Sequence, residues 1–368
     1  MKRLFTVLTS IALTFALSFS AAFASDDAFL KSQNYLKTIA LDSPDAVIAY
    51  EATGMEADYK ADALLNNFKE TDYVTASYGD LAKSIIAISL LGENPKDFNN
   101  TNLVEILENR VQEDGTLTND VNGGCGATIW TLMALETVNS PKVKAVADKL
   151  STMAMDNGAY WYEYQGPNAD LDTTGWAMEA LSVAGRSTYK AAISKAYTFV
   201  QSKLNSTDGY YDNWGGNADT QSCVLEGLSV AGYTLDTNAY NYLLSYQNED
   251  GTFNALNYST GQLEPNAYAS VEGARALGVI NNGSFVLRAR RDYTETTTPV
   301  VTEPETPTTP TKPSTTTPAV KPETTTTEPK KETVKVVNTG DNTNVMAYVV
   351  AAIAAVGVIV LVIKSKKK

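Results

Sequence analysis

Residues 173–185 read TTGWAMEALSVAG, and residues 220–232 read TQSCVLEGLSVAG. Both segments are apolar, carry little charge and end at a glycine, which is the pattern of a helix packed on several sides. Comparable segments occur at residues 46–54, 81–92, 128–137 and 266–278. Their last residues are separated by 38, 45, 48, 47 and 46 positions along the chain. This regular interval identifies an internal repeat.

Each repeat has room for a second helix. A more polar stretch follows each apolar segment, for example at residues 187–204 and 235–247. Four such stretches are followed by Asp-Gly or Asn-Gly, at residues 114–115, 157–158, 208–209 and 250–251. These pairs favour chain reversal, because glycine adopts positive φ and Asx side chains bond to the local backbone. The sequence therefore predicts an all-α domain of about six helical hairpins, each with an apolar inner and a polar outer helix.

Two short motifs suggest a family for this domain. Residues 247–253 (QNEDGTF) resemble the Q-x-x-x-G-x-W repeat signature of the prenyltransferase and squalene-cyclase superfamily, with Phe in place of Trp. Residues 170–174 (DLDTT) resemble the D-x-D-D-T motif of class II terpene cyclases. The resemblance covers roughly residues 30–285 and implies an alpha/alpha toroid, which we assign to residues 25–290. Cobalamin carriers and complement-like thioester domains share this toroid, so the fold does not determine the function.

The two ends of the chain predict export and anchoring. Residues 1–24 combine a basic start, an apolar run and an A-x-A site ending at Ala24, as in a secretory signal peptide. Residues 345–363 contain no charge and are long enough to cross a bilayer as a transmembrane helix. The basic tail at residues 364–368 then stays in the cytoplasm, and the rest of the chain lies outside.

The segment before this span predicts a stalk and a processing site. Residues 291–336 are rich in Thr and Pro and cannot bury enough apolar surface to fold, so we expect a disordered stalk. Residues 337–344 contain Thr339-Gly340, which resembles the sorting signal cut by sortase in Gram-positive wall proteins. Val336-Val337 replaces the usual Leu-Pro. The expected partners are sortase and peptidoglycan, and the alternative is a membrane span that is retained.

Composition excludes several classes of function. The chain has 368 residues, 29 basic and 42 acidic side chains, a net charge of −13 and no histidine. A nucleic-acid binder is not expected, because phosphate contacts need clustered Lys and Arg. Catalysis through a Ser-His-Asp triad and zinc sites that use imidazole are excluded. We expect no metal and no cofactor, and any acid–base chemistry has to use other side chains, such as Asp and Glu.

The acidic candidates lie where inner helices are expected to begin. Asp172 and Asp219 occupy the same place in consecutive repeats. One interpretation is that both cap a helix N-terminus. The resemblance to terpene cyclases instead implies that Asp172 is a general acid supported by Asp170, although Thr173 replaces the third Asp of that motif. Asp172, Asp170 and Asp219 are therefore the candidate catalytic residues.

A glycan-degrading toroid enzyme is a second enzymatic alternative. Such enzymes use two carboxyl groups about 5 to 10 Å apart. Glu163, Glu179 and Glu226 extend the set of candidates. Glu179 and Glu226 lie in the middle of their segments, where facing solvent is the competing interpretation.

Aromatic residues supply candidate ligand contacts. They stack on sugars or planar ligands, or they wedge one repeat against the next. Trp130 and Trp176 match each other in register and line the centre of the toroid or pack it. The complete set of candidate binding residues is Trp130, Trp176, Tyr160, Trp161, Tyr211 and Trp214.

Two cysteines remain in the exported chain. Gly124-Cys125-Gly126 resembles the start of the thioester motif G-C-G-E-Q, but the glutamine is missing, so no thioester can form. Cys125 is then a small packing residue or an exposed thiol. A bridge to Cys223 is not expected, because the two lie in repeats that are not neighbours.

These observations favour a binding or adhesion module displayed on the cell surface. Its ligand would be an extracellular small molecule, a glycan or a host molecule. The alternative is an exported enzyme of the terpene-cyclase-like or glycan-degrading type that uses Asp and Glu. The sequence shows no acid–base pair that is distinct from the expected capping residues. We therefore favour a binding function over an enzymatic one.

Overall fold

A computed structural model describes residues 26–56, 66, 68–120, 123–162, 166–211 and 216–293. The predictions for the signal peptide, the stalk beyond residue 293, the sorting signal, the transmembrane helix and the tail, and those for Glu163 and Trp214, lie outside the described residues. The described residues are mostly helical, as expected. Among their helices, none is long and apolar enough to span a membrane.

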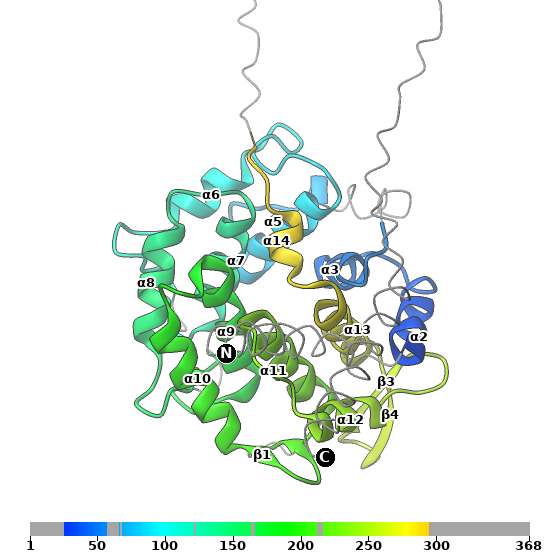
Figure 1. Ribbon diagram of the computed structural model, residues 1–368. Helices are drawn as coiled ribbons and strands as arrows, with labels where there is room; N and C mark the ends of the chain where they lie inside the picture. The colour runs from blue at the N-terminus through cyan, green and yellow to red at the C-terminus, as the bar shows by residue number, and fades with distance from the viewer. Residues whose placement is uncertain are drawn as a thin grey trace, which may run out of the picture. The chain divides into compact units, whose positions relative to one another are not determined.

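Six inner helices form the centre of the fold among the described residues. They correspond to the six apolar segments, and several of them are buried along almost their whole length because neighbours cover them on more than one side. Their bounds are α3 (Pro44–Ala52), α5 (Tyr78–Leu90), α7 (Gly126–Thr137), α9 (Leu171–Gly185), α11 (Ala218–Ala231) and α13 (Ala267–Asn282). Each contacts the next along the chain, and α13 also contacts α3. The series of contacts between inner helices is therefore closed (Figure 1).

In the described part of the chain, five outer helices lie outside this series (Figure 1). Each has one buried face, as Ile193, Ala196 and Val200 illustrate for α10. Their bounds are α2 (Asp26–Leu36), α6 (Leu103–Asn109), α8 (Val143–Met153), α10 (Lys190–Ser202) and α12 (Thr237–Ser245). Two short antiparallel hairpins, which the all-α expectation did not include, pair β1 (Leu204–Asn205) with β2 (Gly209–Tyr210) and β3 (Phe253–Asn257) with β4 (Gln262–Asn266).

The predicted turns pack against the next outer helix. Gly158 has a positive φ of 89°, and a Cβ added there would lie 2.4 Å from the backbone oxygen of Lys195 in α10. Gly251 has a φ of 86°, and its added Cβ would lie 2.1 Å from the backbone oxygen of Lys31 in α2. Only glycine fits such an approach. The turn of the last repeat therefore packs on the first outer helix.

The glutamine of the repeat signature strengthens this closing contact. The Gln247 side-chain amide donates to the backbone oxygen of Ala28 and to the hydroxyl of Ser32, both at 2.9 Å. Both partners lie in α2, so residues more than two hundred positions apart in sequence are joined by hydrogen bonds.

A short helix covers the C-terminal ends of several inner helices. This helix, α14 (Phe285–Ala289), contacts α3, α5 and α7, and Phe285 is fully buried. On one side of it, Asn282 donates to the backbone oxygen of Ala52 at 2.9 Å. On the other side, the backbone N–H of Arg291 donates to the oxygen of Thr137 at 3.1 Å. Ala52 and Thr137 are the last residues of α3 and α7, so this end is covered.

Candidate functional site

Three consecutive inner helices present polar side chains at the same spacing. Residues i, i+4 and i+7 of a helix share one face, so each set of three points in one direction. The sets are Asp172, Trp176 and Glu179 on α9, Asp219, Cys223 and Glu226 on α11, and Tyr268, Glu272 and Arg275 on α13. Their contacts join the sets into one group, which we call the central cluster.

The deepest part of the central cluster is an ion network. Arg275 is fully buried, and its two terminal nitrogens donate to the two carboxylate oxygens of Glu272 at 2.9 and 2.8 Å. The Nε atom of Arg275 donates to both oxygens of Glu226 at 3.1 Å. This forked geometry is the strong form of an arginine–carboxylate pair. The buried arginine therefore holds two glutamates from neighbouring helices.

A third buried glutamate joins this network. Glu179 is fully buried, and its Oε1 accepts from the hydroxyl of Ser284 at 3.0 Å. Burial, and next to it the charge of Glu226, raise the pKa of Glu179 well above its usual value. The protonated form of Glu179 is therefore favoured, because one arginine cannot offset three buried carboxylates. Glu179 and Glu226 do not face solvent, which corrects the solvent-facing interpretation of both residues.

Two tryptophans lie beside this network. The rings of Trp130 in α7 and Trp176 in α9 have centroids 5.8 Å apart. The Lys83 ammonium lies 4.6 Å from the centroid of Trp130 and also pairs with Asp45 at 2.8 Å. The Arg275 guanidinium lies 6.0 Å from the same centroid. Both rings are buried, so their first role is packing and cation–π contact.

Asp219 senses the charges of this network but makes no ion pair with it. Burial, and then the charge of Glu272, raise its pKa to about 6, while Arg275 acts in the opposite direction. Its Oδ1 atom is buried and has no hydrogen-bond partner among the described residues. The same is true of the indole Nε1 of Trp176, in the neighbouring helix. An unsatisfied acceptor and an unsatisfied donor therefore occur in the same cluster.

The structure reassigns the predicted helix caps. Asp170 is the N-cap of α9, where its Oδ1 accepts from the backbone N–H of Thr173 at 2.7 Å. Asn217 is the N-cap of α11. Asp172 and Asp219 are therefore the second residues of their helices, and the capping interpretation of both is wrong. Burial, then the charges of Glu272 and Asp172, raise the pKa of Cys223. Asp172 and Asp219 therefore belong to the same cluster.

The aromatic residues of the predicted loops differ in how far they are buried. Tyr160 is fully buried and therefore offers no surface to an external ligand. Trp161 is partly buried, and its backbone oxygen accepts from the N–H of Cys125 at 3.0 Å. Tyr211 is 47% exposed. Of these three, only Tyr211 presents a large free ring surface.

Both cysteines are buried, and neither forms a disulfide. For Cys125 this rules out the exposed thiol and leaves the packing role. The Sγ of Cys223 donates to Glu272 at 3.5 Å, and burial above all raises its pKa. Cys223 is therefore a protonated thiol rather than a nucleophile.

Sequence reasoning did not identify Glu272, Arg275 and Lys83. A signal for the first was present, because Glu179, Glu226 and Glu272 each lie six positions before the glycine that ends their segment. The two cations were visible as the only basic residues within the six apolar segments. What the sequence did not indicate is that these charges meet.

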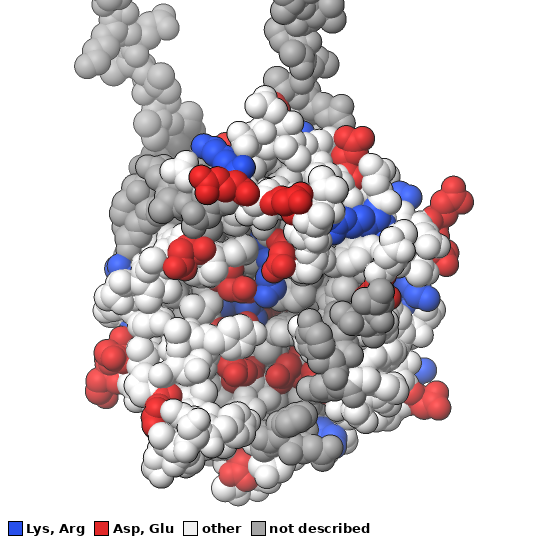
Figure 2. Space-filling model, turned by 180° about the vertical axis from the view of Figure 1, so that it is seen from behind, with Lys and Arg blue, Asp and Glu red and all other residues white. Residues whose placement is uncertain are grey.

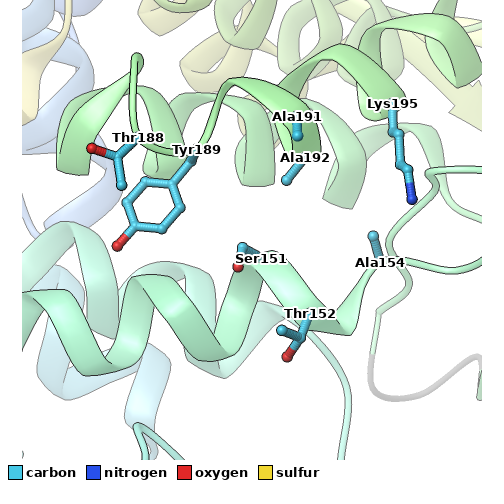
Figure 3. A pocket seen from close by; sticks show the side chains of 8 residues that line it. All are labelled: Ser151, Thr152, Ala154, Thr188, Tyr189, Ala191, Ala192 and Lys195. Atoms are coloured by element: carbon cyan, nitrogen blue, oxygen red, sulfur yellow. The ribbon is translucent and has the colours of Figure 1, made fainter.

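Charged side chains also gather on the surface of the molecule. Figure 2 shows acidic side chains gathered around a few basic ones near the middle of the face opposite to that in Figure 1. By contrast, the hollow of about 320 Å³ between α8 and α10 is lined mainly by small and hydroxyl side chains, with Lys195 as its charged residue (Figure 3). The central cluster therefore offers the richer chemistry.

No protein-family model matches this chain, and no curated protein matches it. Among the described residues, no three His, Cys, Asp or Glu side chains are grouped closely enough to hold a metal ion.

Proposed function

We propose that residues 25–290 form an alpha/alpha toroid that is displayed outside the cell and binds a ligand at the central cluster. The closed series of inner-helix contacts supports the toroid. So does the packing of the last repeat turn, at Gly251, against the first outer helix. The resemblance of residues 247–253 to the superfamily's repeat signature agrees with both.

The main support for ligand binding is that two buried polar atoms of the cluster lack hydrogen-bond partners among the described residues. Buried polar atoms almost always have a hydrogen-bond partner, and an exception indicates a water or ligand position. Asp219 Oδ1 and Trp176 Nε1 are such exceptions among the described residues. Tyr268, one turn of α13 before Glu272, is 51% exposed, so the cluster reaches solvent. α14 covers the opposite, C-terminal end of the inner helices, so we place ligand entry on the side of Tyr268.

Surface display is the second part of the proposal. A signal peptide, a Thr/Pro-rich stalk and the Thr339-Gly340 site would carry the domain through the wall and attach it to peptidoglycan through sortase. Mass spectrometry of the chain released from walls checks this, because sortase processing predicts a C-terminus at Thr339. A chain recovered only from membranes, with residues 345–363 still attached, would support the retained span instead.

One observation favours the exported enzyme as a second candidate. A carboxyl group with a pKa of about 6, as at Asp219, exchanges protons readily near neutral pH and suits a general acid. Asp172 would be its partner, because Glu179 and Glu226 are held in the arginine network. An enzyme would release product from a terpenoid or glycan substrate, and Asp219→Asn would abolish that turnover. A binding module would show affinity without turnover.

A ligand screen of the full chain in mild detergent tests the proposal. We expect a bound ligand to raise the melting temperature by mass action, by about 2.7 kcal/mol of stabilisation at a hundredfold excess over Kd. The screen covers sugars, amines, cobamides, wall fragments and polysaccharides. The double variant Asp172→Asn, Asp219→Asn should lose the shift, whereas Asp236→Asn, at the cap of α12, should keep it. A screen without any shift would refute binding.

A further inference from the structure

We propose that the central cluster binds a protonated primary amine that carries hydroxyl groups, which is the chemistry of an amino alcohol or an amino sugar. This inference rests on the proposed function and names the ligand class for the same site. It is supported by Asp219, by Trp176 and by the balance of charges around them.

The charge balance favours a cationic ligand. Among the described residues of this region, Lys83 pairs with Asp45, and Arg275 is held by Glu226 and Glu272. Asp219 makes no ion pair with a described residue, although it lies close enough to Glu272 and Arg275 to sense both charges. Carboxylates therefore outnumber cations, and an added positive charge at Asp219 would be attracted.

The donor requirement favours an amine over a neutral group. An ionised carboxylate only accepts hydrogen bonds, so Asp219 Oδ1, which has no partner among the described residues, requires a donor. A charged N–H donor forms a shorter and roughly twice as strong a bond with a carboxylate as a neutral donor does. A primary ammonium supplies three such donors on one small group.

The indole N–H of Trp176 requires an acceptor, and this favours a ligand that also carries hydroxyl groups. Trp176 is 9% exposed, and its indole N–H has no acceptor among the described residues. Trp176 lies one turn after Asp172 on the face of α9 that joins the cluster. A hydroxyl oxygen next to the ammonium would accept from this N–H. The ring of Tyr268, 51% exposed, offers a flat surface to the rest of such a molecule.

A metal ion fits less well. Hard cations such as Ca²⁺ take six to eight oxygen ligands. Among the described residues, no group of three carboxylate, thiol or imidazole side chains is arranged to hold a metal. An ammonium ion needs fewer carboxylates, because its N–H groups can also bond to neutral oxygen atoms.

Isothermal titration calorimetry of the full chain in mild detergent, at pH 7.5, tests the class with two matched pairs. Glucosamine is compared with glucose, and ethanolamine with 1-propanol, so that each pair differs in its charged group. We expect each amine to bind at least tenfold more tightly than its neutral counterpart. A further tenfold preference for glucosamine over ethanolamine would identify the amino sugar, and equal affinities would identify the amino alcohol as sufficient.

Two variants with the same change of charge serve as test and control. Asp219→Asn should weaken amine binding at least tenfold, whereas Asp236→Asn, at the N-cap of the outer helix α12, should leave it unchanged. Lowering the pH to 5 should also weaken binding about tenfold in the wild type, because a group with a pKa of about 6 is then mostly protonated. The charged groups that act on Asp219 are Glu272 and Arg275 on α13, and Asp172 on α9 acts on the adjacent Cys223.

The results separate this inference from the proposed function. Equal binding of glucose and glucosamine would overturn the amine class but leave ligand binding at the cluster intact. Unchanged amine affinity in Asp219→Asn would overturn the assigned site. If neither amine binds while another ligand from the wider screen does, the class is wrong and the function stands. If nothing in either experiment binds, both fail.

Discussion

Replacing Asp219 by Asn should make this protein more stable, not less. The carboxyl has a pKa of about 6 in the folded chain, against 3.8 for an unperturbed Asp. Each unit of that difference in pKa corresponds to about 1.4 kcal/mol. The folded state therefore loses up to about 3 kcal/mol when Asp219 is ionised at pH 7, and Asn, which has nearly the same shape, avoids this loss.

The sign of the effect fixes its pH dependence. Because the folded pKa is raised, the contribution of Asp219 to stability is complete below pH 3.8 and is lost as the pH rises through about 6. Asp219→Asn should thus match the wild type near pH 4 and exceed it progressively up to pH 7. For a domain of this size, about 3 kcal/mol corresponds to a rise in melting temperature of roughly 6 to 10 °C.

Thermal unfolding of the full chain in mild detergent measures this difference, with tryptophan fluorescence reporting on Trp130 and Trp176. Asp236→Asn is the control, because Asn caps a helix as well as Asp does and should change stability by less than about 0.5 kcal/mol. A variant that melts below the wild type at pH 7, or a difference that does not vary with pH, would refute the reasoning.

Three further substitutions test the packing and the ion network. Gly251→Ala should lower the free energy of unfolding by about 3 kcal/mol, because a Cβ adds positive-φ strain and meets the backbone of Lys31. The control is Gly261→Ala, which places its Cβ in open space and should cost only about 1 kcal/mol. Equal melting temperatures of the two variants would contradict the closing contact. Arg275→Met should cost about 3 to 5 kcal/mol in chemical denaturation, because it leaves buried carboxylates unpaired, and a neutral result would show that the network is not held by charge. Glu179→Gln should leave stability near pH 4 unchanged and reduce its decline as the pH rises, since the pKa of Glu179 is raised; melting curves from pH 4 to 9 decide this.

The candidate site was only partly predictable from the sequence. Asp172 and Asp219 were recognisable because they recur at the same place in consecutive repeats. Their role as caps was wrong, because Asp170 and Asn217 lie at the residues where the helices begin. A shift of two positions along a helix changes the direction of a side chain by about 200°. Repeat position alone could not resolve that difference.

The sequence predicted the inner helices, their spacing and the turns between repeats, because apolar periodicity and Asp-Gly pairs act over short distances along the chain. Where the polar residues inside those helices point depends on tertiary packing. Glu226 and Glu272 gather on Arg275 because three inner helices turn the same face to one place. That convergence depends on contacts between distant segments, and no local pattern of residues encodes it.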